Sequence, residues 1–403
     1  MKFPLLSSLA LALAAASTNF AAEPASLSDA IAQGKISLNA RLRYESAAQT
    51  GKLDAEALTL RTRLGFTTAP LHGWKAMLEF ENITAADNDS YNQAGLNPTA
   101  AGNRTVIADP TGSEINQAFL SYTQDKTTAT LGRQRLVLDN HRFVGDGAWR
   151  LNMQTFDAVV VQDKSLDKTT LTYAYLNRIN RTFGERHPQG KFDSRSHVFH
   201  AAYTGLPAGT LTGYAYLLDF TNSTNNSCAT YGASFVGTTK LTDEFKFVYR
   251  AEYATQSDYG SSTLNYRARY YDLEAGLAAK QVSLTLGQEL LGSDHNAGFR
   301  TPLATLHPMN GWADLFTTTP ATGLRDSYLK ATANLPADIS LLAYYHDFKS
   351  DVGRVPFGKE FDAYLLRKFG KATTGIIKFA DFRRDSLTLP NVRKLWIQLE
   401  YIY

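Results

Sequence analysis

The chain has 403 residues, with 41 Lys and Arg against 38 Asp and Glu, and 44% of its residues are hydrophobic. These fractions exclude a disordered chain and a low-complexity fibre. A net charge of +3, dispersed along the chain, gives no reason to expect nucleic-acid binding. The single cysteine, Cys228, excludes an internal disulfide framework and a cysteine-rich zinc site.

The first 22 residues read as a secretory signal peptide. Lys2 supplies the positive charge of the n-region, Leu5 to Ala16 forms the apolar h-region, and the small residues Ala21 and Ala22 end the segment. The apolar stretch is shorter than the roughly 20 residues that a membrane-spanning helix needs. We therefore expect residues 1–22 to be a signal peptide, 23–34 a periplasmic segment, and 35–403 the folded domain.

From residue 35 onward the dominant pattern is alternation. In 35–45, Ile36, Leu38, Ala40, Leu42 and Tyr44 share one face, and polar or charged residues share the other. Successive side chains of a strand point to opposite faces, so this strand has one apolar wall and one polar wall. Similar segments follow to the last residue, and no later run approaches 18 apolar residues. The pattern predicts a transmembrane β-barrel and excludes a protein of membrane-spanning helices.

Eighteen such segments can be counted, near 35–45, 57–68, 74–82, 114–123, 128–135, 154–162, 170–178, 197–204, 211–220, 229–238, 245–253, 265–278, 281–290, 325–334, 339–347, 360–369, 373–382 and 394–403. Odd-numbered connections tend to be longer than even-numbered ones, as expected when both termini lie in the periplasm. The fold class predicted is all-β: an antiparallel up-and-down barrel of about eighteen strands, with short periplasmic turns and long extracellular loops. Tyr403 ends a strand typical of those that the outer-membrane assembly machinery recognises.

The first three strands place cations on the face opposite the apolar residues: Arg41, Arg43, Arg61, Arg63 and Lys75. If the leucines face lipid, these cations line the lumen, because the pleat leaves no other choice without a bulge. Because like charges this close repel, we expect the basic strip to be neutralised by carboxylates such as Asp139 or Asp157 from an inward-folded loop, or by a bound anion. A basic strip favours anions, but acidic residues occupy inner positions elsewhere: Glu79, Glu81, Glu252, Asp272, Glu274 and Glu400.

A distinctive block lies in the first half of the chain. It comprises Leu131-Gly132-Arg133-Gln134-Arg135-Leu136, Asp139-Asn140-His141-Arg142-Phe143-Val144-Gly145, Trp149-Arg150 and Thr155-Phe156-Asp157. The block resembles the hallmark region of the alginate-export family of outer-membrane porins, as does Gly358-Lys359-Glu360-Phe361-Asp362 near the C-terminus. The resemblance implies a monomeric barrel of about eighteen strands that exports an anionic polyuronate or serves as a general or solute-selective porin.

Charged residues of this block are candidates for the pore lining: Arg133, Arg135, Asp139, Arg142, Arg150 and Asp157. A ladder of cations facing carboxylates would create a transverse field in the lumen that orients polar solutes. Alternatively, the same Arg–Asp pairs pin a loop to the barrel wall. Both interpretations stay open, since a pinned loop also narrows a pore.

Other functions find less support in the sequence. No nucleophile elbow, HExxH motif or phosphate-binding glycine loop appears, so we expect no enzyme and no cofactor. His197 and His200 would lie on opposite faces of a strand, which disfavours a metal pair. Asp87 to Ser90 is oxygen-rich, but such a run is usually a solvated loop, and we predict no metal site. A barrel with a plugged lumen and a structural role stays possible.

The sequence therefore predicts an integral porin of the Gram-negative outer membrane that passes hydrophilic, preferentially anionic, solutes. Its expected partners are the lipid bilayer, lipopolysaccharide, the assembly machinery and small polar or anionic solutes. Export of an alginate-like exopolysaccharide is the alternative.

Overall fold

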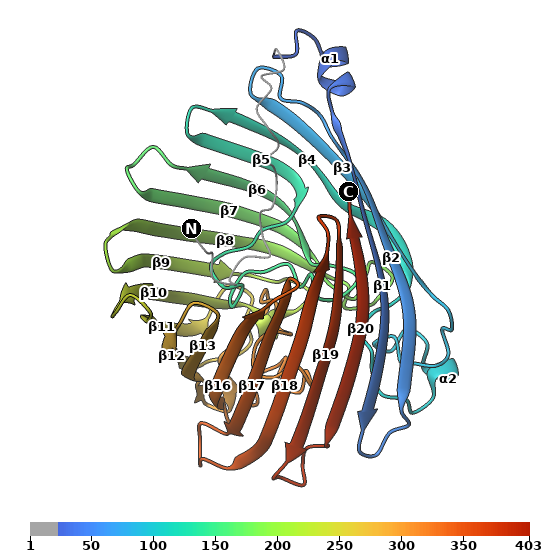
Figure 1. The fold of residues 1–403 in the computed structure, drawn as a ribbon, viewed down its shortest axis with the longest axis vertical. Coiled ribbons are helices and arrows are strands. Elements are labelled where there is room, and N and C mark those ends of the chain that lie inside the picture. The colour runs from blue at the N-terminus through green and yellow to red at the C-terminus, as the bar shows by residue number, and fades with distance from the viewer. Residues whose placement is uncertain (1–22) are drawn as a thin grey trace.

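The computed structural model describes residues 23–403, so the predicted signal peptide lies outside the described residues. Eighteen strands form one closed antiparallel sheet, because β20 pairs with β1 as well as with β19. Figure 1 shows this ring, with α1 and the C-terminus at the end where the connections are short. The predicted fold class is confirmed. Among the described residues, no helix is long and apolar enough to cross a membrane.

The barrel strands are β1 (Lys35–Gln49), β2 (Ala55–Thr67), β3 (Trp74–Ala85), β4 (Gly112–Gln124), β5 (Thr127–Gln134), β6 (Thr155–Asp163), β7 (Thr169–Asn180), β8 (Lys191–Leu206), β9 (Gly209–Leu218), β10 (Cys228–Lys240), β11 (Lys246–Asp258), β12 (Arg267–Ala278), β13 (Val282–Leu291), β16 (Leu324–Leu335), β17 (Ile339–Lys349), β18 (Pro356–Phe369), β19 (Thr373–Arg384) and β20 (Val392–Ile402). The remaining elements are α1 (Leu27–Ala32), α2 (Pro98–Ala101), η1 (Thr224–Asn226), β14 (Ser293–Asp294) and β15 (Ala297–Gly298). Each barrel strand overlaps one predicted segment.

Two local differences from the sequence prediction have simple causes. The strand expected near 197–204 begins six residues earlier, at Lys191, because it continues to pair with β7 past a register shift. The segment before the barrel forms a short helix, α1, whose N-terminus is capped by the Ser26 hydroxyl. The Ala69 amide donates to the Ala30 carbonyl, so this helix packs beside the turn between β2 and β3.

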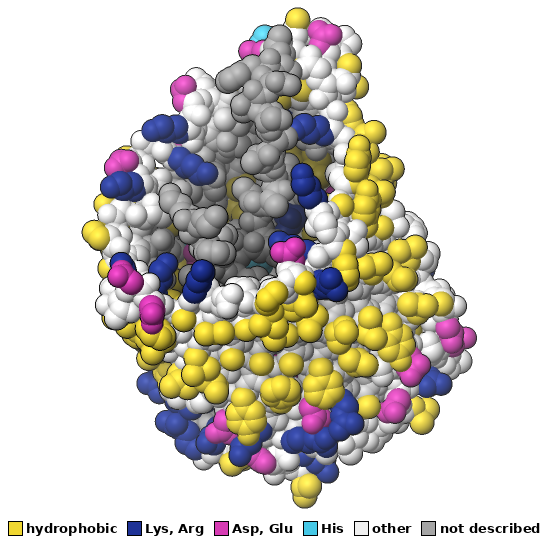
Figure 2. Space-filling model, viewed as in Figure 1, with side chains coloured by type: hydrophobic (Ala, Val, Ile, Leu, Met, Phe, Trp, Pro, Cys, Tyr) yellow, Lys and Arg dark blue, Asp and Glu magenta, His cyan; other side chains and the backbone are white. Residues whose placement is uncertain are grey.

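The outer and inner faces of the barrel differ in the way that the alternation predicts. Large apolar side chains are exposed on the outside, among them Leu42, Leu64 and Leu286, whose relative exposures are 46, 54 and 66%. Figure 2 shows them as a broad apolar belt bordered by charged side chains. Such a belt is the surface that hydrocarbon would cover. Aromatic and aliphatic side chains are also buried inside the ring, including Phe143, Phe299 and Phe348, so segments of chain must fill part of the lumen.

The outward direction of β1 can be tested with one substitution. Leu42→Arg places a guanidinium in the hydrocarbon, and we expect it to lower the free energy of unfolding by about 2–4 kcal/mol. Thr130→Arg, on an inward-facing and partly exposed position of β5, should cost much less because this side of the strand does not face hydrocarbon. Urea titrations of both variants refolded in lipid vesicles measure this. Equal costs would mean that Leu42 does not face lipid.

Candidate functional site

Two long connections fold into the lumen and pack against each other. The first inward loop (residues 135–154) joins β5 to β6, and the second inward loop (292–323) joins β13 to β16. The Gly145 amide donates to the Leu303 carbonyl (2.9 Å), and the Thr305 amide donates to the His141 carbonyl (3.0 Å). Val144 and Leu303, neither of them exposed, lie in one apolar cluster with Phe156 and Ala158 of β6. The weak alternation of β6 in the sequence therefore has a cause: its inner face meets a loop.

The first inward loop reaches distant strands of the barrel. Charged side chains of this loop make its contacts with β8, β13 and β1: Asp139 with His200 (2.9 Å), Arg142 with Glu289 (2.7 Å), and Arg150 with Glu45 (3.2 Å). The wall positions are separated widely around the ring, so the loop spans the lumen. Four of the predicted site residues, Arg135, Asp139, Arg142 and Arg150, lie on it.

Arg135 pairs within the first inward loop itself, with Asp146. Burial alone would raise the pKa of Asp146, but hydrogen bonds from His141 and Arg135 outweigh burial and hold that pKa below its ordinary value. Asp146 therefore stays ionised, and it also accepts from the Ala148 amide (3.1 Å), which fixes the turn leading into Trp149.

The basic strip of β1 and β2 binds the backbone of this loop. Arg41 donates to the carbonyls of Ala148 (3.0 Å) and Trp149 (3.2 Å). Further donations run from Arg43 to the Trp149 carbonyl (2.6 Å) and from Arg63 to the Leu151 carbonyl (3.1 Å). All these groups therefore point into the ring. The loop covers them, and Arg43, for example, is only 1% exposed.

The carboxylates that neutralise the basic strip differ from those expected. Glu400 of β20 contacts Arg41 (3.0 Å) and Arg61 (3.1 Å). Glu81 of β3 pairs with Arg63, and Asp109, from the connection 86–111, pairs with Arg43 (3.3 Å). The expectation that Asp139 or Asp157 would serve here is wrong, since Asp139 binds His200 and Asp157 binds Arg133.

Three predicted site residues lie away from the constriction. Arg133 and Asp157 face outward, because they share a strand face with the exposed residues Leu131 and Val159 and pair with each other at 2.8 Å. This corrects their assignment to the pore lining. Lys75 lies near the short-turn end of β3, opposite Ser121, and is remote from the Glu81 that pairs with Arg63.

The centre of the constriction contains residues that the sequence did not single out. Trp149 stacks on His307 of the second inward loop, with ring centroids 4.8 Å apart. The ammonium of Lys378 in β19 lies 4.1 Å from the Trp149 ring and 3.7 Å from the Trp312 ring. Such cation–π contacts stabilise a cation that water cannot reach well. The alternation of β19 places Lys378 on the inner face, in register with Trp396, and this position is the signal by which the sequence could have indicated it.

Asp314 links both inward loops to the wall. Its carboxylate contacts Arg150 (2.6 Å), Lys394 of β20 (2.7 Å) and His307 (2.7 Å). Burial alone would raise the pKa of Asp314, but these three partners hold it well below its usual range. Burial lowers the pKa of His307 well below its usual range. A neutral ring fits the contacts, because Nδ1 can donate to Asp314 while Nε2 accepts from Lys378 (2.6 Å).

A different sector of the wall is acidic. Glu252 of β11 and Asp272 of β12 share Arg250, and Tyr214 donates to Glu252 (2.7 Å). On β13, β16 and β18 the inward carboxylates are Glu289, Asp326, Glu360 and Asp362, and each of them accepts hydrogen bonds from the second inward loop. The basic strip on β1 and β2 and the acidic sector on β11–β18 thus occupy different strands of the wall.

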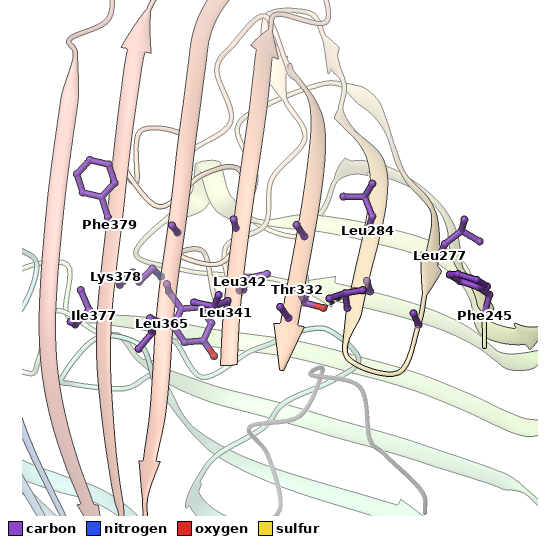
Figure 3. A pocket seen from close by; sticks show the side chains of 18 residues that line it. Phe245, Leu277, Leu284, Thr332, Leu341, Leu342, Leu365, Ile377, Lys378 and Phe379 are labelled. Carbon is purple, nitrogen blue, oxygen red and sulfur yellow. Dashed lines mark hydrogen bonds between the residues drawn. The ribbon is translucent and has the colours of Figure 1, made fainter. Parts of the chain in front are cut away.

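A cavity of about 760 Å³ also occurs on the barrel, but it does not belong to the lumen. It lies over Ala331, Ala343 and Ala363, which stand opposite one another on β16, β17 and β18. Figure 3 shows larger apolar side chains at its margins, such as Leu284 on one side and Phe379 on the other. The exposed outward leucines around it identify a groove in the hydrocarbon-facing wall.

The two histidines considered as a metal pair can be located in the structure. His197 and His200 do point to opposite faces, since His200 binds Asp139 inside and His197 hydrogen-bonds Tyr173 (3.0 Å) outside. In the part of the chain from 23 to 403, no group of three or more His, Cys, Asp or Glu side chains could hold a metal ion.

With this geometry established, comparison with known proteins becomes informative. The family model for alginate export matches residues 32–178. That range contains the basic strip, the first inward loop and the block on which the resemblance rests. No curated protein sequence matches the chain.

Solved structures show that the fold has close counterparts. Pseudomonas aeruginosa OccK9 (OpdG) superposes with a TM-score of 0.74 at 15% identity, covering 93% of this chain and 99% of the other. Acinetobacter baumannii OccAB3 gives 0.74 at 14% identity over 93% and 100%. P. aeruginosa OpdK, solved with vanillate, gives 0.71 at 13% identity over 93% and 99%. At these identities the likeness concerns the fold.

The His307 contacts predict a pH dependence of the constriction. The pKa of His307 is lowered by folding, so the open or unfolded loop binds the proton more readily and closure weakens as pH falls below about 6.5. The depressed pKa of Asp314 acts in the same direction at lower pH. In single-channel recordings we expect acidification to increase the time spent in higher-conductance states. His307→Gln should flatten this response, and a pH-independent wild type would contradict the assignment.

Proposed function

We propose that this protein is an outer-membrane porin through which hydrophilic solutes, preferentially anions, pass without energy input. The observation that carries the proposal is the pairing of an apolar outer belt with a charged interior that two inward loops narrow. Eighteen strands enclose a lumen wide enough for an aqueous channel unless loops fill it. The neighbouring structures of this fold are outer-membrane porins, which supports the same function.

The charge distribution supports a preference for anions. Guanidinium groups of Arg41, Arg43 and Arg63 hold the carbonyls of residues 148–151 at the constriction. A solute carboxylate is a stronger acceptor for a guanidinium than a neutral carbonyl is. An anionic solute can therefore replace the loop carbonyls, and a cation cannot. OpdK was crystallised with vanillate, an aromatic carboxylate, so a small carboxylate is a suitable first solute to try.

The proposed function also implies a location in the cell and a route of assembly. The mature chain would lie in the outer membrane as a monomer, with the short turns in the periplasm and the longer connections outside. Tyr403 lies at the short-turn end beside β1, where its amide and carbonyl pair with Leu38. The C-terminal strand would be the segment recognised by the assembly machinery.

The direct test is conductance of the purified protein in planar bilayers. We expect discrete channels and a reversal potential that indicates higher permeability for chloride than for potassium. Protein that shows heat-modifiable mobility, and is therefore folded, yet never conducts under any pH or salt condition would instead support a plugged structural barrel.

Selectivity should depend on the charge of the basic strip. Replacing Arg41, Arg43, Arg61 and Arg63 together with Gln should lower the anion-to-cation permeability ratio several-fold, most clearly at low salt, where screening is weak. The matched variant with Lys at all four positions keeps the charge but loses the bidentate geometry. It should retain selectivity while loosening the loop. Equal ratios in the Gln variant and the wild type would mean that the strip only anchors the loop.

Export of an anionic exopolysaccharide is the second candidate, favoured by the alginate-export match over residues 32–178. A polymer must thread the constriction, so oligouronates should block single channels for times that lengthen with chain length. If monomeric and oligomeric uronates block equally briefly, the channel serves small solutes only.

A further inference from the structure

We infer that the outer rim of β12–β20 binds the phosphate groups of a glycolipid in the outer leaflet, the lipid A part of lipopolysaccharide. This rests on the proposed location in the outer membrane, but it concerns the outside of the barrel and not the pore. The binding surface, called here the basic rim, consists of outward cations at the long-loop ends of these strands: Arg267, Arg269, Lys349, Lys359, Arg383 and Arg393.

The pleat fixes the outward direction of these side chains. On β12, Tyr270 is not exposed and Ala268 is 2% exposed, whereas Arg267, Arg269 and Leu273 are exposed, so the two arginines share the hydrocarbon-facing side. On β18 the same alternation separates the exposed Lys359 and Phe361 from the buried Glu360 and Asp362. In Figure 2 blue side chains gather beneath the apolar belt on the face formed by β16–β20.

Several cations of the basic rim lack a counter-charge. Within the described part of the chain, Arg267, Arg269 and Lys359 form no ion pair. Lys359 stands opposite Asp347 in register, yet Asp347 pairs with Lys349 at 2.7 Å. Arg383 and Arg393 share one carboxylate, because both contact Asp381. Cations therefore outnumber carboxylates along this rim.

The opposite sector of the rim is different. On the strands β5–β8 themselves, outward cations pair with carboxylates: Arg133 with Asp157, Arg178 and Lys191 with Asp193, and Arg195 with Asp219. In the connection between β7 and β8, Arg186 donates to the Thr111 carbonyl instead of a carboxylate. A general requirement for solubility or topology does not explain why the outward cations of β12 and β18 lack carboxylate partners while those of β5–β8 have them. Their position is better explained by an external anion that contacts only that sector.

The surface below the basic rim fits the rest of such a lipid. Leu273, Phe361 and Ile377 face outward there, with exposures of 51, 46 and 52%. Acyl chains descending from the phosphates would cover this apolar surface. A molecule with two phosphates at the membrane surface and several acyl chains below matches both features, whereas free phosphate matches only the first. Each Lys or Arg near an anionic membrane surface adds to the attraction for that surface.

The test compares lipid binding by two matched variants. One replaces Arg267, Arg269 and Lys359 with Gln; these residues hold no ion pair among the described residues, so no carboxylate loses its partner. The control replaces Lys126, Lys280 and Lys371, exposed at the short-turn end, with Gln. Native mass spectrometry of the detergent-solubilised barrels measures binding of diphosphorylated lipid A and of lipid A from which both phosphates have been removed.

We expect the rim variant to bind diphosphorylated lipid A at least about tenfold more weakly than the wild type, and the control variant to bind like the wild type. Dephosphorylated lipid A should not distinguish the three proteins. Equal binding by the rim variant and the wild type, or an equal loss in the control variant, would overturn the inference. Unchanged conductance of the rim variant in planar bilayers separates this outcome from a failure of the porin proposal.

Discussion

The rest of the structure depends on ring closure. Because β1 pairs with β20 as well as with β2, no barrel strand is left with an open edge in the membrane. Closure also removes any freedom in side-chain direction, since each strand must present alternate residues to hydrocarbon and to the lumen. Leu42 and Leu64 face out, and Arg41 and Arg63 must then face in.

The inward arginines determine what the loops do. A guanidinium that is buried without acceptors is costly, and Arg61 and Arg43 are 0 and 1% exposed. The strands supply too few carboxylates for the whole strip, so the remaining donors take carbonyls from residues 148–151 and the carboxylate of Asp109. The first inward loop is therefore held by the same charges that would select solutes. The inward arginines thus determine both the conformation of this loop and the polarity of the wall.

The sequence predicts the strands well because the alternation is a local signal that repeats in each strand. The outward direction of Arg133 can also be predicted from the local sequence, because Leu131, two residues before it, lies on the same face. The assignment of Arg133 to the pore lining gave more weight to the motif than to this alternation. Contacts across the lumen cannot be predicted from the local sequence. Arg150 meets Asp314, and Arg142 meets Glu289, only because closure brings distant strands and loops together. Nothing in the local pattern around Asp314 or Lys378 marks them as partners.

The strengths of these contacts limit how the constriction can open. Breaking a buried ion pair such as Arg142–Glu289 or Arg150–Asp314 costs roughly 3–5 kcal/mol. Releasing the whole first inward loop would break several such pairs and would leave its apolar residues in water. The bonds from Arg41, Arg43 and Arg63 to the carbonyls of 148–151 are weaker, about 1.5–3 kcal/mol each, and an anion can replace them one at a time. Opening by exchange of acceptors therefore costs far less than opening by loop displacement, and it admits only solutes that can accept from a guanidinium. On the proposed function, one step at the basic strip, the exchange of loop carbonyls for a solute anion, would therefore both open the channel and select anions.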